Sequence, residues 1–138
     1  MADNIIIDTG AIVGLANRRD QYHQWCKKEA AILDYPFFTC EAVLSESFHL
    51  LKSVPNGIKL LVGLLEKDLI KVAFSYSNYA AELHQLIEKY ADLPAGFADA
   101  CLVQMAETTR KARIFTVDSD FNIYRLQSGK ALSLISPQ

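Results

Sequence analysis

The chain has 138 residues and a mass of 15.4 kDa, which is the size of one compact domain and too small for two independent cores. Its composition, 51% hydrophobic and 22% charged, excludes a disordered or fibrous chain, so we expect residues 1–138 to form a single domain. The net charge of -2 excludes an overall positive field, and binding to nucleic acid would therefore need local basic patches or metal ions.

Short apolar runs alternate with helical patterns along the chain. In order, the pattern predicts a strand at 5–7, helices at 11–17 and 21–33, a strand at 37–39, helices at 41–51 and 58–67, a strand at 70–74, helices at 79–90 and 94–109, and strands at 113–117 and 132–135. We expect Asp20 and Ser77 to cap the helices that follow them, and Pro94 to begin the helix that contains it. The alternation predicts a three-layer α/β/α fold around a mostly parallel sheet of four or five strands.

The sequence also bears on the location of the protein. Each apolar run is much shorter than the ~18–20 residues of a membrane span, and acidic residues flank the first run where a secretory signal would be basic. The three cysteines are Cys26, Cys40 and Cys101, an odd number without metal-site spacing, which fits reduced thiols. We therefore expect a cytoplasmic protein that does not associate with a membrane.

Two acidic residues follow predicted strands. Asp8 comes directly after the strand at 5–7, and Asp118 comes after the strand at 113–117. Ligands of parallel α/β sheets bind beyond the carboxyl ends of the strands, so both carboxylates are candidates for a functional site. The alternative for each is that it merely caps the helix or turn that follows.

Two further acids lie within predicted helices. Glu46 falls beside Val43 and Leu50, on the border of the apolar arc of its helix, where it either reaches into a cleft or lies in solvent. Asp99 lies in a helix that is apolar nearly all round, where an ionised carboxylate needs a partner to offset its desolvation. That partner is either a metal ion or a Lys or Arg from elsewhere in the chain.

These acids stand in four short segments that occur in a characteristic order. The segments are Ile-Asp-Thr-Gly-Ala at 7–11, the helix around Glu46 at 39–51, Leu-Pro-Ala at 93–95 leading into Ala-Asp-Ala at 98–100, and Thr-Val-Asp-Ser-Asp-Phe at 116–121. Together they resemble the PIN domain family of metal-dependent ribonucleases, and specifically its small VapC-type toxin branch. The stretch between Leu51 and Tyr90 has no usable family motif.

The resemblance implies a site and a chemistry. It carries the family's acidic site over to Asp8, Glu46, Asp99 and Asp118, with Asp120 as a fifth candidate, and suggests that Thr9 and Thr116 orient the cluster. Oxygen ligands of this kind suit Mg²⁺ or Mn²⁺, with Asp8 and Asp99 in direct contact and Glu46 and Asp118 holding waters or a second ion. The implied reaction is endonucleolytic cleavage of RNA that leaves 5′-phosphate ends.

Candidate RNA contacts are basic and aromatic. Arg18, Arg19, Arg113 and Arg125 are local candidates for phosphate contacts, although most such residues simply lie in solvent. Four aromatic residues are candidates for stacking on unpaired bases, with burial in the core as the alternative: Tyr22, Trp25, Phe121 and Tyr124.

Partners follow from the resemblance and from one apolar segment. The toxin branch implies a small antitoxin protein that binds near the acidic cleft. The stretch at 58–69 is more apolar than one buried stripe requires, which together with the resemblance predicts a homodimer.

Other functions stay open at this point. The alternatives are a stand-alone PIN nuclease in RNA processing and a degenerate PIN module that binds RNA or protein without catalysis. Nucleophilic catalysis by a Cys or His is disfavoured because no Cys has an obvious paired His. A phosphoacceptor receiver domain is disfavoured because the first strand lacks an acidic pair.

Overall fold

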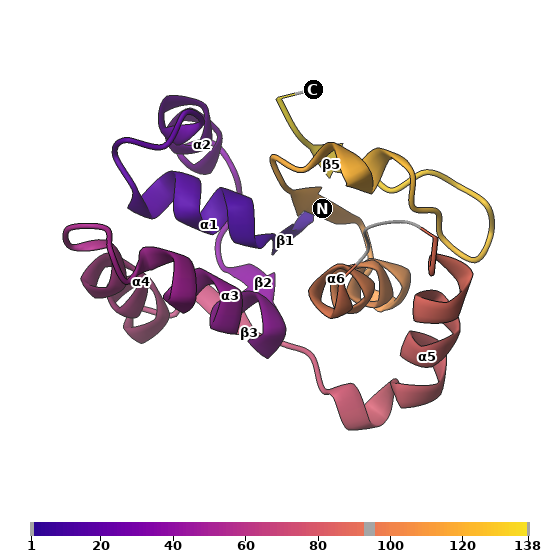
Figure 1. Ribbon diagram of the computed structural model, residues 1–138. Coiled ribbons are helices and arrows are strands. Elements are labelled where there is room, and N and C mark those ends of the chain that lie inside the picture. Colours follow the sequence, from indigo (N-terminus) through magenta and orange to yellow (C-terminus); the bar gives the residue numbers. More distant parts are fainter. Residues whose placement is uncertain (1, 93–95, 138) are drawn as a thin grey trace.

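The computed structural model describes residues 2–92 and 96–137. Strands and α-helices alternate along the chain (Figure 1). The elements are β1 (Asn4–Ile7), α1 (Thr9–Ala16), α2 (His23–Ala30), β2 (Phe37–Thr39), α3 (Glu41–Leu51), α4 (Gly57–Glu66), β3 (Ile70–Val72), the 3-10 turn η1 (Tyr76–Asn78), α5 (Ala80–Lys89), α6 (Phe97–Thr108), β4 (Ala112–Phe115), the 3-10 turn η2 (Ser119–Asn122) and β5 (Leu134–Ile135).

The described strands form one parallel sheet in the order β3-β2-β1-β4-β5. β1 is the central strand because its three isoleucines are buried on both faces, as a strand covered by helices requires. Its register places Ile7 opposite Phe115 of β4, so the residues that follow these two strands are level with each other. The predicted α/β class is confirmed, and every strand in the described sheet is parallel.

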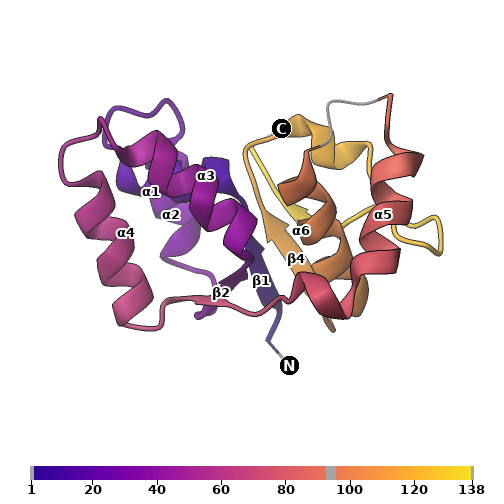
Figure 2. The same cartoon turned by 60° about the horizontal axis from the view of Figure 1, so that its bottom comes forward.

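Helices flank the sheet in two groups. α1 packs against α2, α3 and α4, while α5 packs against α6 and α6 packs against β1 and β4. Figures 1 and 2 show α1 to α4 together on one side of the molecule and α5 with α6 on the other. α3 and α6 are in contact, which brings the helix that carries Glu46 to the helix that carries Asp99.

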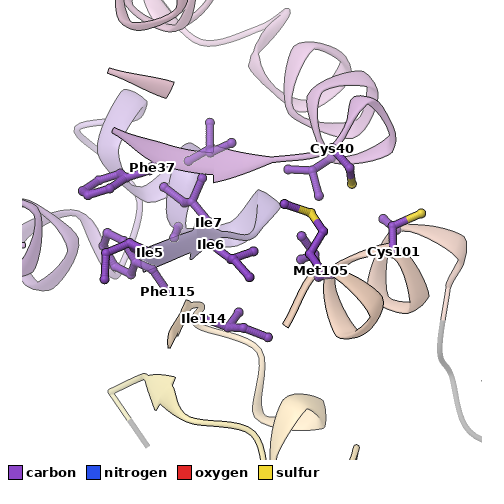
Figure 3. Close-up of a cluster of buried hydrophobic side chains, with 14 of the residues drawn as sticks. Ile5, Ile6, Ile7, Phe37, Cys40, Cys101, Met105, Ile114 and Phe115 are labelled. Carbon is purple, nitrogen blue, oxygen red and sulfur yellow. The ribbon is translucent and has the colours of Figure 1, made fainter. Parts of the chain in front are cut away.

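The core lies around β1. Figure 3 shows Ile5, Ile6, Ile7, Phe37 and Phe115 clustered among the strands, with Met105 extending toward them from α6. The ring of Phe115 meets those of Trp25 and Phe37 edge to face, with centroids 5.7 and 5.8 Å apart. Full burial of one such side chain is worth roughly 1.5–3 kcal/mol, so this cluster fixes the position of the central strands.

Several helix boundaries differ from the predictions. α1 begins at Thr9 because the side chain of Asp8 caps it. The predicted cap by Asp20 is wrong for α2, since Asp20 Oδ1 accepts from the N–H of Tyr22 and stabilises the preceding turn. The predicted cap by Ser77 is also wrong, because Ser77 lies within η1 and α5 begins at Ala80 without a side-chain cap. Pro94 lies outside the described residues.

Strand lengths also differ. The predicted strands at 70–74, 113–117 and 132–135 are shorter in the structure, with β3 ending at Val72, β4 at Phe115 and β5 spanning Leu134–Ile135. β4 ends at Phe115, although the N–H of Thr116 still donates to the carbonyl of Ile135 at 3.0 Å, and the Thr116 hydroxyl then accepts from the N–H of Asp118. No helix in the described ranges has the length and apolarity needed to cross a membrane.

α4 explains part of the apolar segment at 58–69. Leu61 is fully buried, and Leu64 and Leu65 pack against the core, so these residues are covered within the chain. Ile58 and Leu60 remain 38% and 42% exposed. The homodimer stays a prediction, with Ile58 as apolar surface that it would cover.

Gly10 lies in the first turn of α1, where that helix passes close to the end of β4. A Cβ on Gly10 would lie 2.5 Å from Cγ2 of Val117, and a Val side chain has little rotamer freedom with which to retreat. Gly63, in the middle of α4, has nothing within 4 Å of the same position. The two helical glycines therefore differ in their surroundings.

We predict that Gly10→Ala lowers the free energy of unfolding by about 1–3 kcal/mol, because the clash outweighs the better helix propensity of Ala. The matched control, Gly63→Ala, should raise it by about 0.5–1 kcal/mol. Urea denaturation of both variants measures the difference. Equal stabilisation by the two substitutions would show that Val117 yields without cost.

Candidate active site

The site is built where β1 and β4 end side by side. The backbone N–H of Asp8 donates to the carbonyl of Phe115 at 3.0 Å, which carries the sheet one residue beyond β1. Asp8 is then the N-cap of α1, and the N–H of Thr9 donates to its Oδ1 at 2.7 Å. Asp8 is only 6% exposed, so its carboxylate is held in the interior between the two strands. Asp8 therefore caps the helix that follows it, while its role as a site residue stays a prediction.

The second oxygen of Asp8 joins the two strand ends. The hydroxyl of Thr116 donates to Asp8 Oδ2 at 2.8 Å, and the same hydroxyl oxygen accepts from the N–H of Asp118 at 2.9 Å. Asp118 Oδ1 in turn accepts from the N–H of Asp120 at 2.9 Å, which caps η2. Thr116 is fully buried, so this chain of hydrogen bonds fixes the carboxylates of Asp8 and Asp118 relative to each other.

Asp99 reaches the site from α6, which belongs to the group formed by α5 and α6. It lies in the first turn of α6, where the helix dipole favours a negative charge. The hydroxyl of Tyr124 donates to its Oδ2 at 2.9 Å. Tyr124 is 1% exposed and packs edge to face with Phe121 and Tyr90, so its hydroxyl is held firmly in place.

Glu46 approaches Asp99 from α3. The buried face of α3 consists of Val43, Ser47 and Leu51, whereas Leu50 is 52% exposed, so the apolar arc assumed from the sequence was centred wrongly. Glu46 itself is exposed, yet its charge helps to raise the pKa of Asp99. Glu46 therefore faces the acidic cluster from its exposed position.

Burial and mutual repulsion set the protonation of the two inner acids. Burial raises the pKa of Asp8 to about 7, with smaller upward contributions from Asp99 and Asp118, against the hydrogen bonds from Thr116 and Thr9 that lower it. Burial likewise raises the pKa of Asp99, where the hydrogen bond from Tyr124 lowers it and the charges of Asp118 and Glu46 raise it. The four acids predicted from the sequence thus act on one another in one cluster.

No positive side chain balances this cluster in the part of the chain that the structure describes. The ion pair found there joins Arg113 to Asp3 at 3.5 Å, and no Lys or Arg lies among the groups that shift the pKa of Asp8 or Asp99. The alternative in which Asp99 pairs with a Lys or Arg is therefore not supported among the described residues. The cluster has a local excess of negative charge that a bound cation would offset.

The donor set suits a hard divalent ion that keeps most of its waters. Within residues 2–92 and 96–137, no three His, Cys, Asp or Glu side chains are arranged to hold a metal ion by themselves. Mg²⁺ typically takes one or two protein carboxylates, with waters and substrate phosphates filling its other positions. The hydroxyl oxygen of Thr9, buried next to Asp8, has no hydrogen-bond partner among the described residues and is available to an oxygen-bearing ligand. The residues present therefore fit such an ion.

Thr9 and Thr116 both hydrogen-bond to Asp8, as the resemblance suggested. Thr9 orients Asp8 through its backbone N–H, not through its hydroxyl. Asp120 is partly buried next to Asp118, and its charge contributes to the raised pKa of Tyr124. Asp120 therefore lies at the margin of the cluster, on the side of Tyr124.

The predicted RNA contacts divide into two groups. Arg18 and Arg19 are exposed and line a cavity. Arg113 is paired with Asp3, and the guanidinium of Arg125 donates to the carbonyls of Asn122 and Tyr124, so both have intramolecular partners. Among the aromatic candidates, Phe121 and Tyr124 are buried in the core, and base stacking by these two is excluded in this conformation.

Sequence reasoning missed the role of Tyr124. Its place near Phe121 suggested either stacking or burial, and nothing in the sequence linked it to Asp99, which lies 25 residues earlier. A buried Tyr needs a hydrogen-bond partner for its hydroxyl, and this requirement was the signal available. Which acid lies next to the Tyr124 hydroxyl becomes clear only from the three-dimensional positions of α6 and the segment that follows η2.

Comparison with known proteins agrees with this geometry. Residues 5–126 match the family described as the PIN domain, which includes Asp8, Glu46, Asp99 and Asp118. PIN domains are generally nucleases and typically use divalent metal ions. Comparison with curated proteins gives no significant match. Because the family match extends over most of the 138 residues, the chain belongs to the PIN domain family.

Proposed function

We propose that this chain is a single-domain, Mg²⁺- or Mn²⁺-dependent endoribonuclease whose catalytic residues are Asp8, Glu46, Asp99 and Asp118. The observation that carries the proposal is the convergence of these four acids at the ends of β1 and β4, with no Lys or Arg paired to them among the described residues. Mutual repulsion within such a cluster lowers the free energy of unfolding. Active sites usually carry this kind of destabilisation because their charged groups are positioned for catalysis.

The chain's own residues supply orientation. Thr116 and the N–H of Thr9 hold both oxygens of Asp8, and Tyr124 holds one oxygen of Asp99, so the remaining lone pairs of these carboxylates have fixed directions. Glu46 is exposed and lies on the open side of the cluster, where it can orient a water or accept a proton.

Asp8 and Asp99 would hold the divalent ion directly, while Glu46, Asp118 and Asp120 would hold its waters or a second ion. When bound, such an ion acidifies a water and stabilises negative charge on phosphate oxygens. The protein residues keep this geometry rigid through Thr116 and Tyr124, and no protein nucleophile is required. Cleavage in this way leaves 5′-phosphate ends.

Within the family, we place the chain in the VapC-type toxin branch, with an antitoxin and a second copy of the chain as partners. The four quoted sequence segments and the short length support this placement. Exposed Ile58 on α4 and Leu50 on α3 offer apolar surface to a protein partner. Growth arrest on expression, relieved by Asp99→Asn, would separate a toxin from an RNA-processing nuclease.

A degenerate module that binds RNA or protein is the second candidate, and it is disfavoured by the site. A binding surface for RNA gains nothing from four mutually repelling acids. The absence of metal-dependent cleavage across a broad RNA panel would favour this candidate.

We predict that wild type cleaves RNA only with Mg²⁺ or Mn²⁺, and that Asp99→Asn lowers kcat more than about 100-fold. Even partners that only orient a metal ligand are worth about 10- to 100-fold, so loss of a ligand should cost more. Gel-based cleavage assays with metal and with EDTA measure both effects. Asp68→Asn is the matched control, because Asp68 is exposed and has a φ of 57° that Asn also adopts.

Thermal melts separate loss of metal binding from loss of folding. Mn²⁺ at a hundredfold excess over its Kd should stabilise wild type by about 2.7 kcal/mol, and Asp99→Asn should lose most of that gain. In EDTA the Asn variant should melt at or above wild type, since it removes a repelling charge. A clearly lower melting temperature in EDTA would show instead that Asp99 has a structural role.

We predict that Thr116→Val lowers kcat by about 10- to 100-fold and moves the acid limb of the kcat pH profile to higher pH. The substitution removes the hydrogen bond that lowers the pKa of Asp8, so this carboxylate stays protonated to higher pH. Thr39→Val is the matched control, because the buried hydroxyl of Thr39 donates to the carbonyl of Ile7 at 3.0 Å and contacts no acid. If the kcat pH profile of Thr116→Val is not shifted, Thr116 does not position Asp8 for catalysis.

We predict that the metal-free protein loses stability as pH rises from about 4 to about 7, and that Asp8→Asn flattens this dependence. The pKa of Asp8 is raised in the folded state from 3.8 to about 7, so in this window the folded protein binds a proton that the unfolded chain has released. Urea unfolding across this range measures the slope. Asp3→Asn, which alters a surface ion pair, is the control, and parallel curves for wild type and Asp8→Asn would refute the prediction.

A further inference from the structure

A cavity of about 500 Å³ lies at the opposite end of α1 from Asp8. Its basic rim consists of Arg18, Arg19, His23 and Lys27, and its apolar floor includes Leu15, Val54 and Leu60. None of the residues that line it is acidic. Three full positive charges therefore gather around one hollow in a chain whose net charge is -2.

The basic rim is free to bind an anion. Arg18, Arg19 and Lys27 are exposed, and among the described residues none of them forms an ion pair. The neighbouring Asp20 has one carboxylate oxygen engaged by the N–H of Tyr22 at 2.9 Å. A bound anion would therefore not have to displace an existing ion pair.

The rim is also partly preorganised. The N–H of Arg19 donates to Oδ1 of Asn17 at 3.0 Å, which fixes the turn that presents both arginines. His23 Nδ1 lies 2.7 Å from the carbonyl of Gly14 and donates to it, which leaves Nε2 for a ligand. A fixed backbone lowers the entropic cost of binding.

The distance to the acidic cluster matches a short length of RNA. α1 runs from Thr9 to Ala16, 8 residues, and so spans about 12 Å between the two sites. A stacked strand advances about 3.4 Å per nucleotide, so the cavity lies about three or four nucleotides from Asp8.

We propose that this cavity binds a backbone phosphate of the RNA substrate about three or four nucleotides away from the bond that is cut. This inference rests on the proposed ribonuclease function and adds the place where the strand is held. The guanidinium groups of Arg18 and Arg19 bind phosphate oxygens, Lys27 adds charge, and the apolar floor covers a ribose or base face.

RNA is favoured over an acidic peptide for an electrostatic reason. The acidic cluster repels the phosphates on either side of the cut bond, so the enzyme needs attraction elsewhere on the same strand. The cavity supplies this attraction at the far end of α1, the helix that Asp8 caps. An acidic peptide that does not enter the acidic cluster gives no reason for a basic cavity about 12 Å from that cluster.

The test compares Arg18→Gln/Arg19→Gln with wild type on two substrates. For a 12-nucleotide RNA, the double variant should raise KM at least about tenfold with kcat unchanged, since each charge-assisted contact is worth about that factor. For a dinucleotide, which is too short to reach the cavity, kcat/KM should be unchanged. The control variant, Arg110→Gln/Lys130→Gln, removes two exposed charges outside the cavity and should leave both substrates unaffected.

Equilibrium binding provides a readout that does not depend on cleavage. Anisotropy of a fluorescent 12-nucleotide RNA should show weaker binding to the double variant, and its salt slope should become less steep by about 1.4, or about 0.7 for each lost phosphate contact. If wild type does not cleave RNA but the double variant still binds RNA more weakly than wild type, the proposed ribonuclease function would be overturned and the RNA site would stand.

Two outcomes would overturn the RNA site. Unchanged KM, affinity and salt slope in the double variant, with normal cleavage, would leave the cavity to another ligand such as an acidic peptide. Binding of AMP that requires Arg18 and Arg19, with unchanged RNA kinetics, would assign the cavity to a free nucleotide.

Discussion

The buried carboxylate of Asp8 is the constraint on which the rest of the site depends. A charge at this depth is tolerated only with hydrogen bonds, and both of its oxygens receive one, from Thr9 and from Thr116. The partner from Thr116 exists because β1 and β4 are paired in parallel with Ile7 opposite Phe115. The register of two central strands, set by packed isoleucine and phenylalanine side chains, therefore determines the geometry of a functional group at their ends.

Opposing effects then set the charge of the cluster. Burial and repulsion raise the pKa of Asp8 and Asp99, while hydrogen bonds from Thr116, Thr9 and Tyr124 lower it. Burial is the larger effect, so without a bound cation Asp8 keeps its proton up to a pH of about 7. A bound divalent ion would reverse the balance by supplying the missing positive charge. The same hydrogen bonds that limit the cost in the free protein would also fix the lone pairs that such an ion needs.

Much of this arrangement was predictable from the sequence, and the exceptions have physical reasons. Asp8 follows three isoleucines, and Asp99 lies in an apolar helix, so local pattern alone marks both. The partner of Asp99 was not predictable, because the hydrogen bond from Tyr124 joins residues 25 positions apart and depends on how the segment after η2 is placed beside Asp99. The buried face of α3 was misjudged at Leu50, since apolar residues on a short helix do not reveal which of them its neighbours cover.

α1 links the two electrostatic features of the molecule. Its first turn receives the acid of Asp8, and its last turn leads into the basic stretch at Arg18 and Arg19. An RNA strand lying along this helix would meet attraction at one end and, with a cation bound, a neutralised cluster at the other. The two ends of one 8-residue helix thus adjoin opposite charges in a chain whose net charge is only -2.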